Sequence, residues 1–74
     1  MIPMHSIRSV QRALTAQNPE DKDKTIVIQP GMAFEILRQH GKVVAIGMEI
    51  DKKPGVLLTS FHQVWAYTKP LEAP

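Results

Sequence analysis

The chain has 74 residues, of which 43% are hydrophobic, and contains no cysteine. This length allows one domain with a modest core. The lack of cysteine excludes disulfides, thiolate metal ligands and cysteine nucleophiles, and favours an intracellular setting for so small a domain. Nine Lys and Arg against seven Asp and Glu give a net charge of +2, which is too balanced to identify a nucleic-acid partner.

Residues 1–5 lack the basic start and the apolar stretch of a signal peptide. No later run approaches the roughly eighteen apolar residues of a membrane span. We therefore expect a cytoplasmic protein with no membrane partner.

Residues 6–17 are expected to form a short amphipathic helix that begins at Ser6, a good N-cap residue, and ends before Asn18-Pro19. Three helical turns are marginal in water, so this helix must dock on the domain or on a partner. We predict an N-terminal helical arm over 1–19 and a polar linker over 20–24. The predicted partner-binding residues are an apolar stripe and two arginines on the opposite face, namely Ile7, Val10 and Leu14 with Arg8 and Arg12.

From residue 25 onward the pattern is that of a β domain, predicted over 25–68. Apolar, β-branched and alternating runs predict five strands, at 25–29, 33–39, 42–50, 56–59 and 64–68. The predicted fold is mostly β, a five-stranded small antiparallel barrel or strongly bent sheet with a short N-terminal helix, because closing the sheet removes exposed edges.

The breaks between these strands have their own turn chemistry. Pro30-Gly31 predicts a type II turn, and His40-Gly41 predicts a tight hairpin. Gly47 is expected to mark a bulge or bend. Residues 51–55 are expected to form a polar turn, 60–63 a single 3₁₀ turn, and 69–74 a flexible tail.

Three stretches of the chain resemble the bacterial barrel of the Src-homology-three type. They are Gly31-Met32-Ala33-Phe34-Glu35-Ile36-Leu37-Arg38-Gln39-His40-Gly41-Lys42-Val43-Val44, Pro54-Gly55-Val56-Leu57-Leu58 and Ser60-Phe61-His62-Gln63. The resemblance covers residues 25–68 and implies a binding module for peptides, cell-wall fragments or proteins. The chain lacks that family's aromatic groove cluster and has Val43-Val44 where a tryptophan is usual.

Two further resemblances point elsewhere. One pattern is similar to strands of the carbon-storage-regulator family of RNA-binding proteins. It consists of Val44-Ala45-Ile46-Gly47, followed by Pro54 and by Val56 to Leu58. That family's RNA-binding arginines have no counterpart near Val64. As a class, the chain also resembles small proteins that bacteriophages and plasmids encode to bind host machinery, including RNA polymerase.

No catalytic or metal site is predicted. The three histidines, His5, His40 and His62, match no metal-ligand spacing. Ser60 and His62, two residues apart, do not by themselves form a nucleophile–base pair. We therefore expect no enzyme activity and no cofactor.

The aromatic residues near the C-terminus have two interpretations. Trp65 and Tyr67 alternate on the predicted last strand, and we favour their capping the core. The alternative is an exposed platform for a partner side chain or a nucleic-acid base. The candidate platform residues are Arg38, Lys42, Phe61, Trp65, Tyr67 and Lys69.

These features favour a non-enzymatic protein-protein interaction module, in the form of a small phage or mobile-element regulator that binds a host machine such as RNA polymerase. Two alternatives stay open. One is a small nucleic-acid-binding barrel. The other is a homo-oligomeric structural subunit that assembles through a strand edge.

Overall fold

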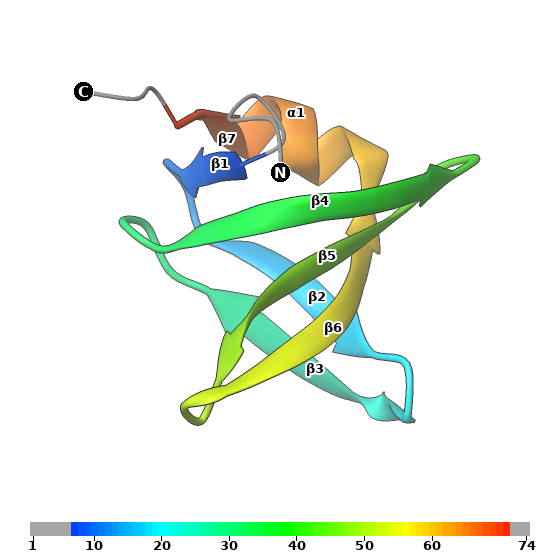
Figure 1. Cartoon of the computed structure of the whole chain (residues 1–74). Helices are drawn as coiled ribbons and strands as arrows, with labels where there is room; N and C mark the ends of the chain where they lie inside the picture. Colours follow the sequence, from blue (N-terminus) through cyan, green and yellow to red (C-terminus); the bar gives the residue numbers. More distant parts are fainter. Residues whose placement is uncertain (1–6, 72–74) are drawn as a thin grey trace.

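The computed structural model describes residues 7–71, except for the side chain of Lys22. Within this range the chain forms one antiparallel sheet and one short helix (Figure 1). The elements in chain order are β1 (Ile7–Val10), β2 (Leu14–Asn18), β3 (Asp21–Ile28), β4 (Ala33–His40), β5 (Val43–Ile50), β6 (Lys53–Ser60), α1 (Phe61–Tyr67) and β7 (Thr68–Pro70).

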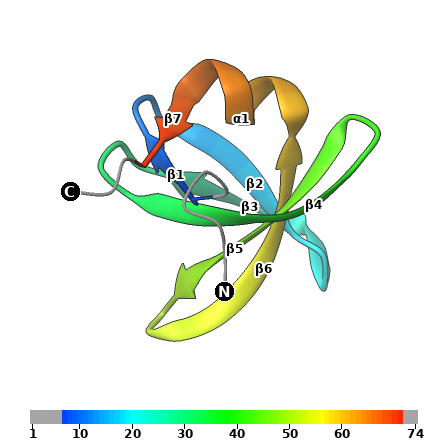
Figure 2. The ribbon, with the colours of Figure 1, turned by 45° about the horizontal axis from the view of Figure 1, so that its top comes forward.

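The seven strands follow the order β3-β2-β6-β5-β4-β1-β7. The sheet is strongly bent, and α1 lies at the end of the molecule that also holds β1 and β7 (Figures 1 and 2). Strands β3 and β7 form the two edges of the order and do not pair with each other, so the sheet does not close. The mostly-β prediction is confirmed. The five-stranded barrel with an N-terminal helix is wrong.

The segment predicted as a helical arm contains two strands, β1 and β2. Within it the buried positions alternate by two, at Arg8 and Val10 and again at Leu14 and Ala16. This is strand periodicity, which the spacing of Ile7, Val10 and Leu14 concealed. An isolated three-turn helix is marginal, whereas β1 gains antiparallel partners on both sides, β4 and β7.

Strands β2 and β3 form a hairpin across the segment expected as a polar linker. The Asn18 side chain accepts a hydrogen bond from the Glu20 backbone N–H at 2.9 Å, which fixes the turn through Pro19. Strand β3 then begins at Asp21, because Asn18 and Asp21 are already paired across the hairpin. Residues 21–24 are therefore part of the sheet.

The core lies inside the bend of the sheet. Strand alternation predicted the inward positions of β4 and β5 correctly, since Phe34, Val44 and Ile46 are buried and Met48 and Ile50 pack against them. The remaining buried apolar residues come from β1, β2, β3, β6 and α1: Val10, Leu14, Ala16, Ile28, Leu57 and Val64.

Three further tight turns connect the strands from β3 to β6. The type II turn at Pro30-Gly31 is confirmed, since Gly31 has φ +94° and the Met32 N–H donates to the Gln29 carbonyl at 3.2 Å. Gly41 has φ +63° in the expected β4–β5 hairpin. The β5–β6 turn is shorter than predicted. It places Asp51 and Lys52 at positive φ, and β6 starts at Lys53.

The bulge predicted at Gly47 lies on the neighbouring strand instead. The pairing of β4 with β5 shifts between Ile36 and Arg38, which leaves Leu37 as the extra residue. Gly47 is paired regularly on both sides, with Glu35 and with Val56. Its role is to give room, since a Cβ there would meet the Leu37 side chain at 3.3 Å.

Helix α1 replaces the predicted 3₁₀ turn and fifth strand. Ser60 is its N-cap, and the Ser60 hydroxyl accepts a hydrogen bond from the Gln63 backbone N–H at 3.2 Å. Val64 is fully buried and anchors the helix to the core. The strand-favouring residues that follow Gln63 therefore complete the helix, and only Thr68 to Pro70 return to the sheet as β7.

Candidate binding face

Two large aromatic side chains are exposed side by side on α1. Phe61 and Trp65 are one helical turn apart, and their ring centroids lie 5.7 Å from each other. Phe61 is 40% exposed and Trp65 is 49% exposed. The sequence-based preference for Trp65 as a cap of the core is therefore wrong, because Trp65 lies on a helix whose buried position is Val64.

Tyr67 has a different environment from Trp65. Residues two apart on a helix are separated by about 200°, so the two rings point to different sides of α1. Tyr67 is half-buried and packs against the core, as expected. The His62 ring meets it nearly edge-on at 6.2 Å between centroids.

An arginine stacks on each of these two aromatic rings. The Arg8 guanidinium lies 4.1 Å from the centroid of the Trp65 ring, and that of Arg12 lies 4.7 Å from the Tyr67 ring. Both distances are within the range of cation–π attraction. We call the surface that passes around α1, from Phe61 and Trp65 with Arg8 on one side to Tyr67 with Arg12 on the other, the aromatic–arginine face.

Arg8 is held rigidly although it is charged. It is only 4% exposed, and it donates from Nε to the Thr68 hydroxyl at 2.7 Å and from Nη2 to the Thr68 carbonyl at 2.9 Å. Burial lowers the pKa of the guanidinium from its ordinary value. The Thr68 hydroxyl in turn donates to the Val64 carbonyl at the end of α1. A positive charge near the C-terminal end of a helix is favourable, so this arrangement ties β1, β7 and α1 together.

The turn after β1 completes the C-terminal end of the helix. The backbone N–H groups of Gln11 and Arg12 both donate to the Tyr67 carbonyl, at 2.8 and 3.1 Å. This carbonyl is one of the four that a helix leaves without an internal partner. The same contact holds Arg12 over the Tyr67 ring, so the position of Arg12 follows from backbone geometry.

The other side of α1 carries a polar cross-link to β2. The side-chain amide of Gln63 accepts from the Thr15 backbone N–H at 2.8 Å and donates to the Thr15 carbonyl at 3.3 Å. It thus pairs with the backbone of β2 as a neighbouring strand would. The Ser60 hydroxyl accepts hydrogen bonds from both the backbone N–H and the side-chain amide of Gln63.

The predicted platform residues are only partly brought together. Phe61, Trp65 and Tyr67 share α1, and Lys42 adjoins them because its carbonyl accepts from the Phe61 N–H at 2.8 Å. Lys69 lies next to the buried Thr68 on β7 and points to the opposite side of the sheet. Arg38 lines a separate hollow of about 190 Å³.

The residues predicted to bind a partner from a helical arm lie elsewhere. Val10 and Leu14 are in the core and have no surface to offer, and Ile7 is half-buried in β1. Arg8 and Arg12 do reach the aromatic–arginine face, but from β1 and the turn after it. One sequence signal could have predicted this face. Ser60 is a good N-cap residue, and Phe61 and Trp65 follow it four residues apart, as neighbours on a helix surface are.

The charge around this face is one-sided. The segments that form it, β1, residues 11–13, α1 and β7, contain no Asp or Glu, and of their basic residues Arg8 and Arg12 lie at the face whereas Lys69 points away from it. Across residues 7–71 the acidic side chains lie on β3, β4, β5 and the hairpin turns beside them. The aromatic–arginine face is therefore a basic, partly apolar surface.

Within the described range, no group of three or more His, Cys, Asp or Glu is placed to hold a metal ion. No helix there is long and apolar enough to cross a membrane. His5 lies outside the described residues.

No protein-family model matches the chain, and it has no significant match among curated proteins or among solved structures.

Proposed function

We propose that the chain is a non-enzymatic interaction module that binds an acidic surface of a partner protein through the aromatic–arginine face. The observation that carries this proposal is the exposed pair of Phe61 and Trp65, with Arg8 stacked on the Trp65 ring. Tryptophan and arginine are enriched among the residues that dominate binding energy at protein interfaces. A contiguous aromatic patch on a small domain indicates an interaction site.

The rigidity of this face supports the same conclusion. Trp65 lies on a helix that is anchored by Val64, and its stacking partner Arg8 is fixed by two hydrogen bonds to Thr68. A partner would therefore bind a preorganised surface and lose little conformational entropy in the contact. The segments that form the face contain no Asp or Glu, which favours a partner of negative charge.

The sequence-based form of this proposal is a cytoplasmic regulator of the phage or mobile-element type that acts on a host machine such as RNA polymerase. That form rests on a resemblance of class. The likeness to small barrels of the Src-homology-three type agrees with a mostly-β interaction module and remains a proposal.

A second candidate function, single-stranded nucleic-acid binding, is favoured by the combination of exposed aromatic rings and basic residues. Bases stack on such rings without sequence preference. Arg8 is already engaged with Thr68, so Arg12 and Lys42 are the cations that remain beside α1. Two phosphate contacts predict weak binding, with a log–log salt slope of only about −1.4.

The third hypothesis, assembly through a strand edge, is less favoured. The outer edge of β3 begins with alternating charges from Asp21 to Lys24. Charged edge residues oppose edge-to-edge pairing.

Trp65 is the only tryptophan, so its fluorescence reports directly on the proposed face. Tagged full-length chain is used to capture partners from a nuclease-treated bacterial lysate, in parallel with Trp65→Ala and with Val27→Ala as a control. Val27 is 51% exposed on β3 and is not part of the aromatic–arginine face. A protein that is captured by the native chain and the control but lost with Trp65→Ala supports the proposal.

The same chain is then titrated with a single-stranded oligonucleotide while Trp65 fluorescence is recorded. Two results together would favour nucleic-acid binding over the leading proposal. They are saturable quenching of Trp65 fluorescence by the oligonucleotide that weakens with added salt, and no specific protein captured from the lysate. Capture that is indifferent to Trp65→Ala refutes the role of this face.

A further inference from the structure

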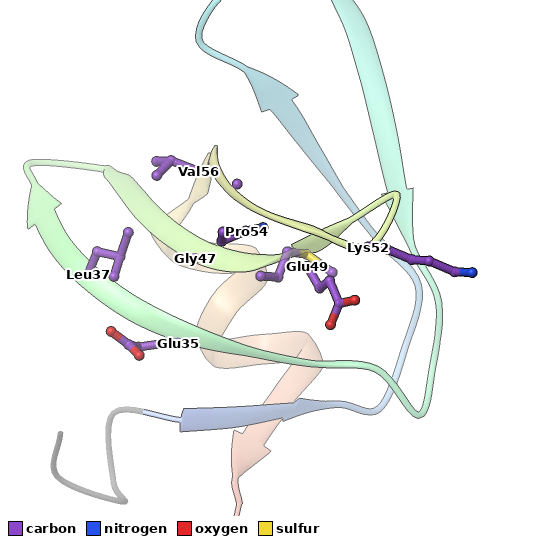
Figure 3. A pocket seen from close by; sticks show the side chains of 9 residues that line it. Glu35, Leu37, Gly47, Glu49, Lys52, Pro54 and Val56 are labelled. Carbon is purple, nitrogen blue, oxygen red and sulfur yellow. The ribbon is translucent and has the colours of Figure 1, made fainter. Parts of the chain in front are cut away.

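A second hollow lies on the outer side of the sheet, on β4, β5, β6 and the turn between the last two (Figure 3). Its volume is about 570 Å³, within the range of ligand pockets. None of its lining residues belongs to β1, α1 or β7. We call it the sheet-face pocket. It is separate from the aromatic–arginine face, and the inference drawn from it does not depend on the function proposed above.

The local irregularity of β4 shapes this pocket. The bulge at Leu37 interrupts the pairing of β4 with β5 and turns this side chain outward beside Gly47. Leu37 already lies at contact distance from the position that a Cβ of Gly47 would take, 3.3 Å away. Glycine at 47 therefore keeps the floor of the pocket low, and a larger residue would fill it.

The walls of the pocket are apolar and accessible. Leu37 is 45% exposed and Val56 is 47% exposed, and Pro54 continues the surface along β6. Exposed aliphatic side chains that converge on one hollow are unfavourable in water unless something covers them part of the time. Figure 3 shows Leu37 and Val56 on the same side of the ribbon.

Two carboxylates border these walls. Glu35 lies opposite Gly47 in the pairing of β4 with β5, and Glu49 follows Gly47 by two residues, so both are on the outward face. Lys52, from the β5–β6 turn, is the one basic residue in the lining. The pocket thus has an apolar centre and a net negative border, the reverse of the charge around α1.

We propose that the sheet-face pocket binds an extended segment of a partner protein in which an apolar side chain has a lysine or arginine two residues away on either side, so that all three side chains face the pocket. The apolar side chain enters the space between Leu37 and Val56. The flanking cations approach Glu35 and Glu49.

The probe is a pair of synthetic peptides blocked at both ends, Lys-Ser-Leu-Ser-Lys and Glu-Ser-Leu-Ser-Glu, in which the charged side chains lie on the same side of the extended peptide as the leucine. Each is titrated into isotope-labelled full-length chain, and the backbone amide resonances are followed by NMR. The lysine peptide is expected to shift the amides of Gly47, Gly55 and Val56 in a saturable way, and the glutamate peptide is expected not to do so. Added salt should weaken the binding of the lysine peptide to the native chain, since the charges are exposed.

Variants then test each part of the pocket. Replacing both carboxylates, by Glu35→Gln with Glu49→Gln, should weaken lysine-peptide binding about threefold to tenfold. Leu37→Ser should weaken it as well, whereas Val27→Ser, an equally exposed change on β3, should leave it unchanged. Leu37, Glu49 and Val27 are exposed and Glu35 is partly buried, and the amide spectrum of each variant shows whether it is folded.

Three results would overturn the proposal. The first is equal binding of the two peptides, or shifts that centre on α1. The second is the absence of any saturable shift in the native chain, which needs no variant to interpret. The third is a shift of the pocket amides with protein concentration alone, which would make a second copy of the chain the occupant.

Discussion

Arg8 and Trp65 stack at 4.1 Å although they are 57 residues apart in the chain, one on a strand and one on a helix. Arg8 is buried and hydrogen-bonded to Thr68, so its guanidinium holds the exposed indole ring of Trp65 in place. The contact therefore connects the stability of the fold with the shape of the proposed binding face.

Arg8→Ala is expected to lower the free energy of unfolding by about 2–4 kcal/mol, since it removes two hydrogen bonds, a cation–π contact and buried packing. Urea unfolding of the full-length chain measures this change. Arg12→Ala is the matched control, because Arg12 is an exposed arginine that also stacks on an aromatic ring. A cost for Arg8→Ala no larger than that of Arg12→Ala would contradict the structural role given to Arg8.

Ser60→Ala is expected to cost about 1 kcal/mol, because it removes the side-chain acceptor from the first turn of α1. Ser60→Asp should retain most of the stability, since aspartate is an equally good N-cap residue. Thermal unfolding of both variants checks this prediction. Equal losses in the two would show that the Ser60 hydroxyl is needed for something other than capping.

Lys52→Gly is expected to stabilise the chain by about 0.5–1 kcal/mol. Lys52 has φ +66° in the β5–β6 turn, a conformation that glycine adopts without strain. Denaturant unfolding measures the gain, and Lys53→Gly provides the comparison, since Lys53 lies in β6 and a glycine there should destabilise. The prediction fails if both changes destabilise the chain alike.

Val64→Ala is expected to cost about 2 kcal/mol, because Val64 is the one buried residue of α1 and its loss leaves a cavity under the helix. Val56→Ala, at a position 47% exposed, should change stability by less than about 0.5 kcal/mol. Equilibrium unfolding of the two variants gives the comparison. Similar costs would mean that α1 is not anchored by Val64.

The central strands were predictable from the sequence because local signals and tertiary contacts agree there. The alternation of Phe34, Val44 and Ile46 marks the inward face, and Pro30-Gly31 and Gly41 mark the turns. Each of these signals acts over a few residues and restricts the local backbone conformation without help from distant contacts.

The two ends of the chain were not predictable in the same way. Ile7, Val10 and Leu14 satisfy a helical spacing, and the pairing that makes them strands involves β4 and β7, far away in sequence. The helix at 61–67 was missed because Val64, Trp65 and Tyr67 favour strands locally. The exposure of Trp65 follows from that helix. The sequence therefore indicated candidate residues for this face, but not how they are arranged.

The hydrogen bond between Arg8 and Thr68 spans 60 residues. During synthesis β1 can find β4 early, but its outer side has no partner until Thr68 to Pro70 have emerged from the ribosome. Strand β1 and the end of α1 therefore form together, late, and depend on each other. The rate of folding should be limited by this long-range closure of the sheet.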